Sequence, residues 1–294
     1  MSARILDGKA AAAEIRNDVS ARIAKFTVDH GEIRLVAVLV GDDPAARLYA
    51  QSQRKRCLQA GVKHDLIELP DSISQSDLLA QVDRLNADPS VTGIMIQLPL
   101  PAQIDEARVQ YRIDPYKDVE GVNPANIGLL FYDHPIIAPC TALAVMELIK
   151  RSGAELRGAQ AVVVGQSRIV GRPISMFLTT QMATVTACHI ATRDLASHTR
   201  AADILVVAAG RPHLIGADFV KRGAIVIDVG INSIKTTDAS GAAVRRTVGD
   251  VKYDEVRQVA GAITPVPGGV GPVTVMMLLR NTVEAAHKQL RREL

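Results

Sequence analysis

Aromatic side chains are scarce in this sequence: they make up 3% of its 294 residues, and tryptophan is absent. A protein that holds nucleic acid by stacking bases on aromatic rings is therefore not expected. Neither sign of charge is in large excess, because 34 Lys and Arg residues and 31 Asp and Glu residues leave a net charge of +3. That balance indicates neither a nucleic-acid partner nor a membrane partner.

Cysteine is rare as well, with Cys57, Cys140 and Cys188 scattered along the chain and no CxxC pair among them. Such an odd, dispersed set excludes a disulfide framework and a cysteine-based zinc site. The seven histidines show no HxxxH or similar metal-ligand spacing. We therefore predict that the protein uses no metal.

Long hydrophobic runs are missing, since no apolar run approaches the ~20 residues that cross a bilayer. The first residues, MSARILDGKAAAAEI, lack the basic-then-apolar pattern of a secretory signal. We expect a soluble, cytoplasmic protein. Its length suggests roughly two domains of ~100–200 residues each, and its apolar fraction of 48% can fill a sizeable core.

Apolar runs and amphipathic stretches alternate along the chain. Buried strands are predicted at 34–41, 66–69 and 91–98, and helices at 6–28, 45–60 and 72–88. The pattern restarts near Pro139, with a helix at 141–153, a strand at 161–164 and further strands in TVTAC, DILVVAAG and GAIVIDVG. Such alternation indicates parallel sheets with crossover helices. We predict two three-layer α/β domains, namely 1–138 completed by a C-terminal helix at 273–294, and 139–272.

A glycine-bounded loop follows the strand at 161–164, running from Gly165 to Gly171 and into a helix. The start of a helix after such a loop is a place where backbone N–H groups bind phosphate. The spacing is G-x(5)-G, so the standard dinucleotide fingerprint is absent. Any strand-to-helix turn in such a sheet also needs glycine, and the loop alone leaves both interpretations open.

The next strand, TVTAC, is followed by His189 and Ile190 instead of the carboxylate that closes an NAD site. Arg172 at the helix start and Arg193 beyond the strand would make the pocket cationic. This favours the 2′-phosphate of NADP over NAD. Each arginine could equally be a surface charge.

Seven stretches carry a resemblance when taken together and in order: GDDPAARLYAQSQ, VTGIMIQLPLP, KDVEGVNPANIG, PCTALAV, GQSRIVGRP, AIVIDVGIN and ITPVPGGVGPVT. Over nearly its whole length the chain resembles the bifunctional methylenetetrahydrofolate dehydrogenase/methenyltetrahydrofolate cyclohydrolase family of one-carbon folate metabolism. The resemblance implies a homodimer of subunits with a folate-facing domain and a Rossmann-like NADP-binding domain. It also implies an active site in a cleft between these domains.

The resemblance further implies roles for individual residues. Tyr49 would stack on the folate pterin, and Gln97 would be the polar partner at the catalytic step. The remaining folate contacts would be Leu98, Pro99, Pro267, Gly268 and Gly269. The cofactor would meet the phosphate-binding turn at Gly165, Gln166 and Ser167, and the backbone of Ile231 would meet the nicotinamide.

Two positions depart from the family pattern. Gln53 stands where the family has a lysine, and Glu120 stands where it usually has the aspartate that holds the amino face of the pterin. Arg54, Lys55 and Arg56 follow Gln53, but successive helix residues turn by ~100°, so we expect a solvated basic face there. The extra methylene of Glu120 could shift the folate by about an ångström.

These departures bear differently on the two reactions of the family. Oxidation moves a hydride, and its catalysis rests largely on positioning, whereas hydrolysis needs proton transfers that glutamine cannot make. With Tyr49, Gln53, Gln97 and Glu120 as the catalytic set, we predict NADP-dependent oxidation with weak or lost hydrolysis, unless Glu120 itself carries the proton. One alternative is a non-catalytic or altered-specificity folate- or nucleotide-binding relative. Another two-domain NAD(P) enzyme would need a proton-carrying lysine or histidine beside the nicotinamide, which we cannot place.

Overall fold

The computed structural model describes residues 2–237 and 243–291, with the side chains of residues 45 and 49 outside that description. The chain divides into two compact units. One unit consists of Met1–Ala13 and Thr141–Thr274, and the other consists of Glu14–Cys140 and Val275–Leu294. We call the first the cofactor-side unit and the second the folate-side unit, after the expectations from the sequence.

The folate-side unit is built on a parallel sheet with the order β3 (Lys63–Leu69), β2 (Arg34–Val40) and β4 (Gly93–Ile96). A bridge between Ile94 and Asp118 extends it by one short segment. The central strand β2 is a continuous apolar run, as befits a strand covered on both faces.

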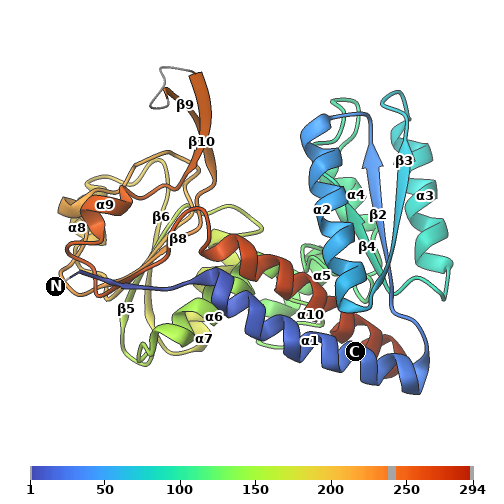
Figure 1. Ribbon diagram of the computed structural model, residues 1–294, viewed down its shortest axis with the longest axis horizontal. Coiled ribbons are helices and arrows are strands. Elements are labelled where there is room, and N and C mark those ends of the chain that lie inside the picture. Colours follow the sequence, from blue (N-terminus) through green and yellow to red (C-terminus); the bar gives the residue numbers. More distant parts are fainter. Residues whose placement is uncertain (1, 238–242, 292–294) are drawn as a thin grey trace. The chain divides into compact units, whose positions relative to one another are not determined.

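Helices cover both faces of this sheet, and Figure 1 shows α2 (Pro44–Ala60) and α3 (Gln75–Ala87) on opposite sides of it. Valines 36, 38 and 40 of β2 pack with α3 and α4 (Glu106–Arg112) in one core cluster. The hydroxyl of Ser74 accepts a hydrogen bond from the Asp77 N–H and caps α3. The predicted α/β architecture of this part is confirmed. A further helix, α5 (Pro124–Phe131), follows the bridge segment.

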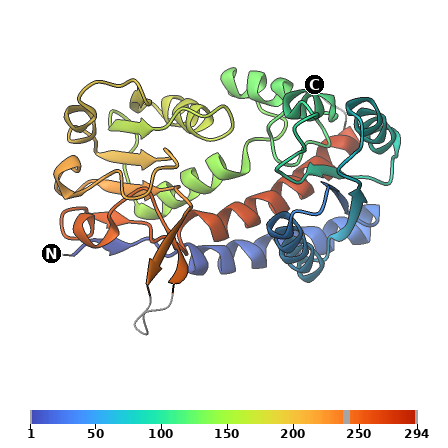
Figure 2. The ribbon, with the colours of Figure 1, turned by 90° about the horizontal axis from the view of Figure 1, so that it is seen from above.

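Two long helices, α1 (Gly8–His30) and α10 (Val270–Arg291), lie side by side in Figures 1 and 2. Asp7 caps α1 by accepting hydrogen bonds from the next turn, as the sequence suggests. Within the folate-side unit, Arg22 pairs with Glu284 across the two helices. Asn281 of α10 donates to the carbonyls of Val119 and Ala138 at 2.9 and 2.8 Å. The last helix is thereby tied to the sheet unit.

The cofactor-side unit holds a parallel sheet with the strand order β1-β11-β8-β7-β5-β6. These strands are β1 (Arg4–Ile5), β11 (Ala262–Ile263), β8 (Ile225–Asp228), β7 (Ile204–Val207), β5 (Gln160–Val164) and β6 (Thr184–Cys188). The helical elements are α6 (Cys140–Ser152), which starts at the last residue of the other unit, α7 (Gly171–Thr180), α8 (Leu195–Thr199), η1 (Ala217–Phe219) and α9 (Tyr253–Val256). The chain goes from β5 to β6 on one side and then to β7 on the other. That reversal makes a Rossmann-like switch point beside β5, where such sheets bind ligands.

Two features of this unit differ from the expectation. Residues 1–13 belong to it, although the sequence grouped them with residues 14–138, because β1 pairs in parallel with β11. A two-residue strand is too short to give a periodic signal. An antiparallel hairpin of β9 (Asn232–Thr237) and β10 (Ala243–Val248) was also not predicted, and Figure 1 shows it projecting from the sheet of its unit.

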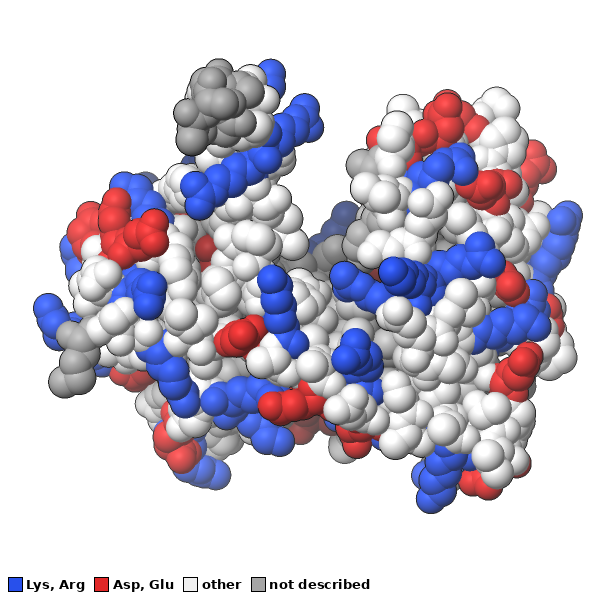
Figure 3. Space-filling view, viewed as in Figure 1, with Lys and Arg blue, Asp and Glu red and all other residues white. Residues whose placement is uncertain are grey.

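The described residues contain no helix that is both long and apolar enough to span a membrane. Figure 3 shows acidic and basic side chains interspersed on the visible face of each unit.

Candidate active site

The position of the family lysine is buried and uncharged. Gln53 lies on the inner face of α2 with 3% of its surface exposed, and Gln97, directly after β4, is 2% exposed. The Gln97 Nε2 donates to the Gln53 Oε1 at 2.9 Å, and the Gln53 Nε2 donates to the Met95 sulfur at 2.9 Å. Two amides therefore hold each other in place at the carboxyl end of β4, and neither can take up a proton near neutral pH.

The basic run behind Gln53 faces water. Arg54, Lys55 and Arg56 are all exposed, as predicted from the helical rotation. None of the three can replace the missing amine on the inner face of α2. Tyr49 belongs to the same helix, but its side chain lies outside what the structure describes, so its stacking role stays a prediction.

Glu120 lies in the turn that follows the bridge segment beside β4. Asp118 pairs with Ile94 in an isolated parallel bridge, and residues 119 and 120 form the turn that follows it. The side chain is half-buried. Burial, together with the negative charges of Asp118 and Glu106, raises the pKa of Glu120 to about 8. Glu120 is thus largely protonated at neutral pH and can donate as well as accept a hydrogen bond.

Asp118 shapes the turn that carries Glu120. It is buried and accepts from the Gly121 N–H, the Asn123 N–H and the Asn126 Nδ2 at 3.1, 2.7 and 2.9 Å. Burial raises the pKa of Asp118, and these hydrogen bonds oppose the rise. Gly121 adopts φ +70°, and a Cβ there would lie 2.3 Å from a backbone carbon of residue 138. The turn therefore fixes the backbone on which Glu120 stands.

The other predicted folate contacts fall into both units. Leu98 and Pro99 follow β4, are exposed, and are joined by a cis peptide bond. Pro267 is exposed, whereas Gly268 and Gly269 are buried in the loop before α10. Those three loop residues belong to the cofactor-side unit, and the glutamine pair belongs to the folate-side unit. Their common role in folate binding stays a prediction.

The predicted phosphate turn is a tight backbone cradle. Gly165 adopts φ +100°, and a Cβ there would lie 2.0 Å from the Ala208 carbonyl oxygen. A Cβ on Gly171 would lie 1.8 Å from the Gly165 carbonyl oxygen. Helix α7 starts at Gly171, and Val170 in the cap position makes no side-chain cap hydrogen bond. This turn lies at the switch point of the sheet, where a helix start can hold a phosphate.

Polar side chains surround this turn in a way that fits a dinucleotide phosphate. The Gln166 Nε2 donates to the Val163 carbonyl at 3.1 Å, and the Arg172 Nε donates to the Gln166 carbonyl at 3.2 Å. Ser167 and Arg172 are exposed. The cradle, the uncapped helix start and a nearby guanidinium are the features that a phosphate requires, so the residues present fit the implied cofactor.

The segment after β6 meets the requirement for a 2′-phosphate. His189 and Arg193 are both exposed there. Asp194 follows Arg193 in the sequence, and its carboxylate accepts from the Ser197 N–H at 3.2 Å as the cap of α8. Arg193 is therefore available to an anion. The described residues include no group of three or more His, Cys, Asp or Glu placed to hold a metal ion.

Ile231 follows β8 and is 72% exposed. Its neighbours are held by two aspartates that the sequence analysis did not single out, Asp228 and Asp250. The Gly230 N–H donates to Asp228 at 3.0 Å, and the Asn232 Nδ2 donates to Asp250 at 2.8 Å. The sequence gives only a weak signal for them, an aspartate within two residues of a glycine in IDVG and VGDV.

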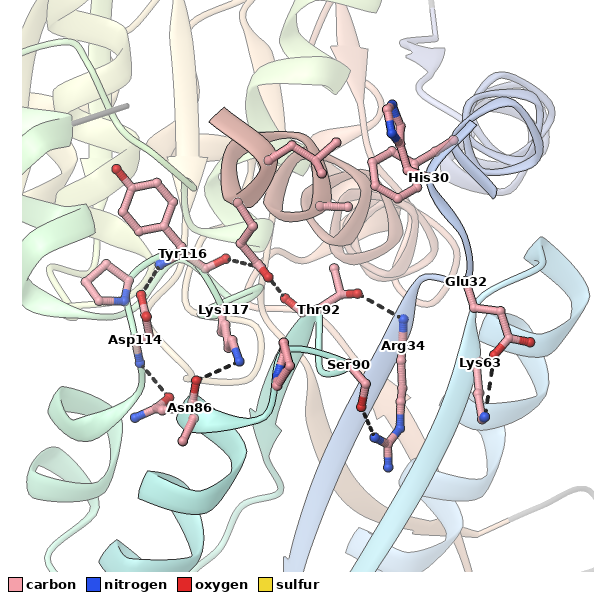
Figure 4. A pocket seen from close by; sticks show the side chains of 17 residues that line it. His30, Glu32, Arg34, Lys63, Asn86, Ser90, Thr92, Asp114, Tyr116 and Lys117 are labelled. Carbon is pink, nitrogen blue, oxygen red and sulfur yellow. Dashed lines mark hydrogen bonds and ion pairs between the residues drawn. The ribbon is translucent and has the colours of Figure 1, made fainter. Parts of the chain in front are cut away.

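A cavity of about 970 Å³ lies elsewhere, at the amino ends of the strands of the folate-side unit (Figure 4). Its polar side chains are engaged within the protein: Lys117 donates to three backbone carbonyls, and Arg34 contacts Asp65 and Ser90. None of the described side chains predicted for the site lines it. Because parallel sheets bind ligands at their carboxyl ends, we place the candidate active site at the opposite edge.

Comparison with known proteins gives consistent matches along the chain. Residues 6–120 match the family model of the tetrahydrofolate dehydrogenase/cyclohydrolase catalytic domain. Residues 139–290 match the model of the NAD(P)-binding domain of the same family. The bifunctional protein FolD of Bordetella avium is 48% identical over 290 residues, which cover 99% of each chain. FolD of Moorella thermoacetica is 46% identical over 288 residues, covering 98% of this chain and all of the relative.

Solved structures agree with these matches. The methylenetetrahydrofolate dehydrogenase-cyclohydrolase of Trypanosoma brucei, complexed with NADP and an inhibitor, superposes with a TM-score of 0.92 at 39% identity and covers 99% of each chain. The FolD enzyme of Campylobacter jejuni gives 0.90 at 42% identity, over 98% of this chain and all of that one. On the strength of both domain matches and of full-length identity well above 30%, this chain belongs to the tetrahydrofolate dehydrogenase/cyclohydrolase family.

Proposed function

We propose that this chain oxidises 5,10-methylenetetrahydrofolate to 5,10-methenyltetrahydrofolate with NADP and hydrolyses the methenyl product weakly or not at all. The observation that carries the proposal is the Gln53–Gln97 pair, two buried neutral amides that bond to each other where the family has an amine. A lysine there could exchange a proton or orient a water molecule through its charge, and the amide pair can only hydrogen-bond.

Oxidation survives such a change because it asks the protein chiefly for positioning. NADP, when bound, supplies the hydride acceptor. The phosphate turn from Gly165 to Arg172 would hold its phosphates. Gln97, fixed by Gln53, would orient the folate, and Glu120 would accept hydrogen bonds from the amino face of the pterin. None of these contacts requires a proton to leave a side chain during the reaction.

Glu120 offers a second candidate function, because its pKa of about 8 lies close to the working pH that suits a general acid or base. In that case the chain would retain hydrolysis through a carboxyl group in place of the family amine. The variant Glu120→Gln separates the two. It abolishes hydrolysis if Glu120 carries the proton, and it only weakens folate binding if Glu120 is a binding group.

Two absorbance assays on one purified sample test the main proposal. The first follows the gain of reduced nicotinamide during oxidation, and the second follows the decay of methenyltetrahydrofolate. We expect clear oxidation and hydrolysis at least tenfold slower. Hydrolysis as fast as oxidation would contradict the proposal that oxidation is retained while hydrolysis is weak or lost. No reduction of NADP by an intact sample would instead favour the non-catalytic relative.

A matched pair of variants tests whether the glutamine at position 53 causes the weak hydrolysis. Gln53→Lys places an amine on the buried inner face of α2 and is expected to raise methenyl hydrolysis at least tenfold. Gln51→Lys places the same amine on the exposed face of the same helix and should leave hydrolysis unchanged. Equal effects from the two variants, or no gain from Gln53→Lys, would count against a role for position 53.

A homodimer, a cytoplasmic location and a preference for NADP over NAD belong to the same proposal. The dimer and the location rest on the family and the sequence, and the preference is supported by the exposed Arg172 and Arg193 near the cofactor turn. Light scattering coupled to size-exclusion chromatography measures the dimer directly. A monomeric mass at micromolar concentration would refute that part.

A further inference from the structure

The segment 209–211 and the side chain of Asn232 meet at one buried carboxylate. Asp250 has no exposed surface. Its Oδ2 accepts from the N–H groups of Ala209 and Gly210 at 2.7 and 2.9 Å. Its Oδ1 accepts from the Arg211 N–H and the Asn232 Nδ2, both at 2.8 Å. An ionised carboxylate has about four acceptor sites, so these four donors use its full capacity.

A second carboxylate holds the first in place. Asp228, 3% exposed, accepts from the N–H groups of Gly230 and Asp250 through its Oδ1, each at 3.0 Å. Its Oδ2 accepts from the Val251 N–H at 3.0 Å. The backbone of Asp250 is thus fixed by Asp228, while the side chain of Asp250 fixes the neighbouring segments.

The packing around the pair leaves no room for adjustment. A Cβ on Gly249 would lie 1.8 Å from the Asp228 Oδ2, and a Cβ on Gly230 would lie 2.3 Å from the Asp250 Cγ. Both distances are far below any contact that a real Cβ makes. The two glycines therefore permit the backbone to close directly onto the carboxylates.

The segments held by Asp250 are the ones that border the proposed cofactor site. Segment 209–211 follows β7, and the adjoining Ala208 packs against Gly165 of the phosphate turn. Gly230 and Asn232, which contact Asp228 and Asp250, flank the exposed Ile231. One carboxylate pair therefore connects the support of the phosphate turn to the residue predicted to meet the nicotinamide.

We propose that Asp250, with Asp228 behind it, is a positioning residue for the dinucleotide, setting the spacing between the phosphate turn and the backbone of Ile231. The inference rests on the proposed function, because it takes these two places as the cofactor contacts. A dinucleotide that spans both places gains affinity only if their separation is fixed in advance, since otherwise binding must order the segments. The residue acts through backbone that it holds and touches no reacting atom.

The substitution Asp250→Asn tests this with almost no change in shape. An amide keeps one acceptor oxygen and turns its NH2 group toward two donors, so two of the four hydrogen bonds are lost. We expect the dissociation constant for NADP, measured by calorimetry without folate, to rise at least tenfold. The matched control is Asp118→Asn, which alters a buried aspartate with three donors in the folate-side unit. It should change NADP affinity less than twofold.

A second variant distinguishes positioning from general loosening. Asn232→Ala removes the side-chain link between Asp250 and the Ile231 segment, together with a longer hydrogen bond of 3.5 Å to the Val248 carbonyl. We expect NADP to bind about fivefold more weakly, while 2′,5′-ADP, which lacks the nicotinamide, binds within twofold of the wild type. Loss of affinity for both ligands would indicate a merely structural role and would overturn the inference. Asn232→Ala also tests the positioning role by itself if Asp250→Asn does not fold.

The outcomes separate the inference from the function on which it rests. If the unaltered chain does not bind NADP at millimolar concentration, the proposed cofactor site itself fails. If the unaltered chain binds NADP and both variants fold and bind it equally well, only the positioning role fails. The positioning role is supported if Asp250→Asn binds NADP more weakly and if Asn232→Ala weakens the binding of NADP but not that of 2′,5′-ADP.

Discussion

Replacing Glu120 by glutamine should stabilise the chain, and the gain should grow with pH. The amide has nearly the same shape as the carboxyl group and no charge to bury. In the folded chain, burial and the charges of Asp118 and Glu106 raise the pKa of Glu120 from an ordinary 4.5 to about 8. At about 1.4 kcal/mol per pKa unit, the ionised group costs the folded state about 3–5 kcal/mol at high pH.

The sign follows from the proton count. Between pH 4.5 and 8 the folded chain holds a proton on Glu120 that the unfolded chain has lost. Stability therefore falls as pH rises through this window. Below pH 4.5 both states are protonated and the cost disappears, and above pH 8 both are ionised and the cost is complete. The glutamine variant lacks this slope, and the other titrating groups are common to both chains.

Urea unfolding of both chains at pH 5, 6, 7 and 8 measures the effect. We expect the stability of Glu120→Gln relative to the wild type to increase by about 3 kcal/mol between pH 5 and pH 8. The exposed Glu155 gives a control, because Glu155→Gln should stay within about 0.5 kcal/mol of the wild type. A difference for Glu120→Gln that is constant over this range would refute the burial argument, and so would one that shrinks as pH rises.

Three further predictions follow from the same structure. If Glu120 binds the pterin as a carboxylate, folate must displace its proton, so the dissociation constant for folate should fall as pH rises toward 8 and level off beyond it; a pH-independent constant measured by fluorescence titration would exclude that role. Arg193→Ala should raise the KM for NADP about tenfold while leaving the KM for NAD within twofold, because only NADP carries the 2′-phosphate; equal changes for the two cofactors would show that Arg193 does not select between them. Asn281→Ala leaves the carbonyls of Val119 and Ala138 without their donor and should lower the free energy of unfolding by about 2–3 kcal/mol; urea midpoints test this, and a loss below about 0.5 kcal/mol would contradict it.

Local signals made much of the folate-side unit predictable. The short, valine-rich run LVAVLV at 35–40 is typical of a strand covered on both faces, and it forms most of the central strand β2. The helix predicted at 72–88 is confirmed as α3, which begins directly after its cap residue Ser74. The exposure of Arg54 and Lys55 followed from helical rotation away from Gln53.

Contacts between distant segments could not be predicted in the same way. The sequence around Gln53 does not predict its contact with Met95, because that contact depends on how α2 packs over β4. Asp250 looks like an ordinary loop aspartate until the fold brings 209–211 and 232 around it. The hairpin of β9 and β10 was missed because its strands are mostly exposed and lack a clear hydrophobic alternation.

The pairing of β1 with β11 imposes an order on biosynthesis. Arg4 and Ile5 leave the ribosome long before their pairing partners in the sheet, Ala262 and Ile263. Strand β1 therefore has no strand to pair with until β11 has emerged, and the sheet cannot be completed before then. Strand β1 thus stays unpaired while the intervening residues 6–261 are being synthesised.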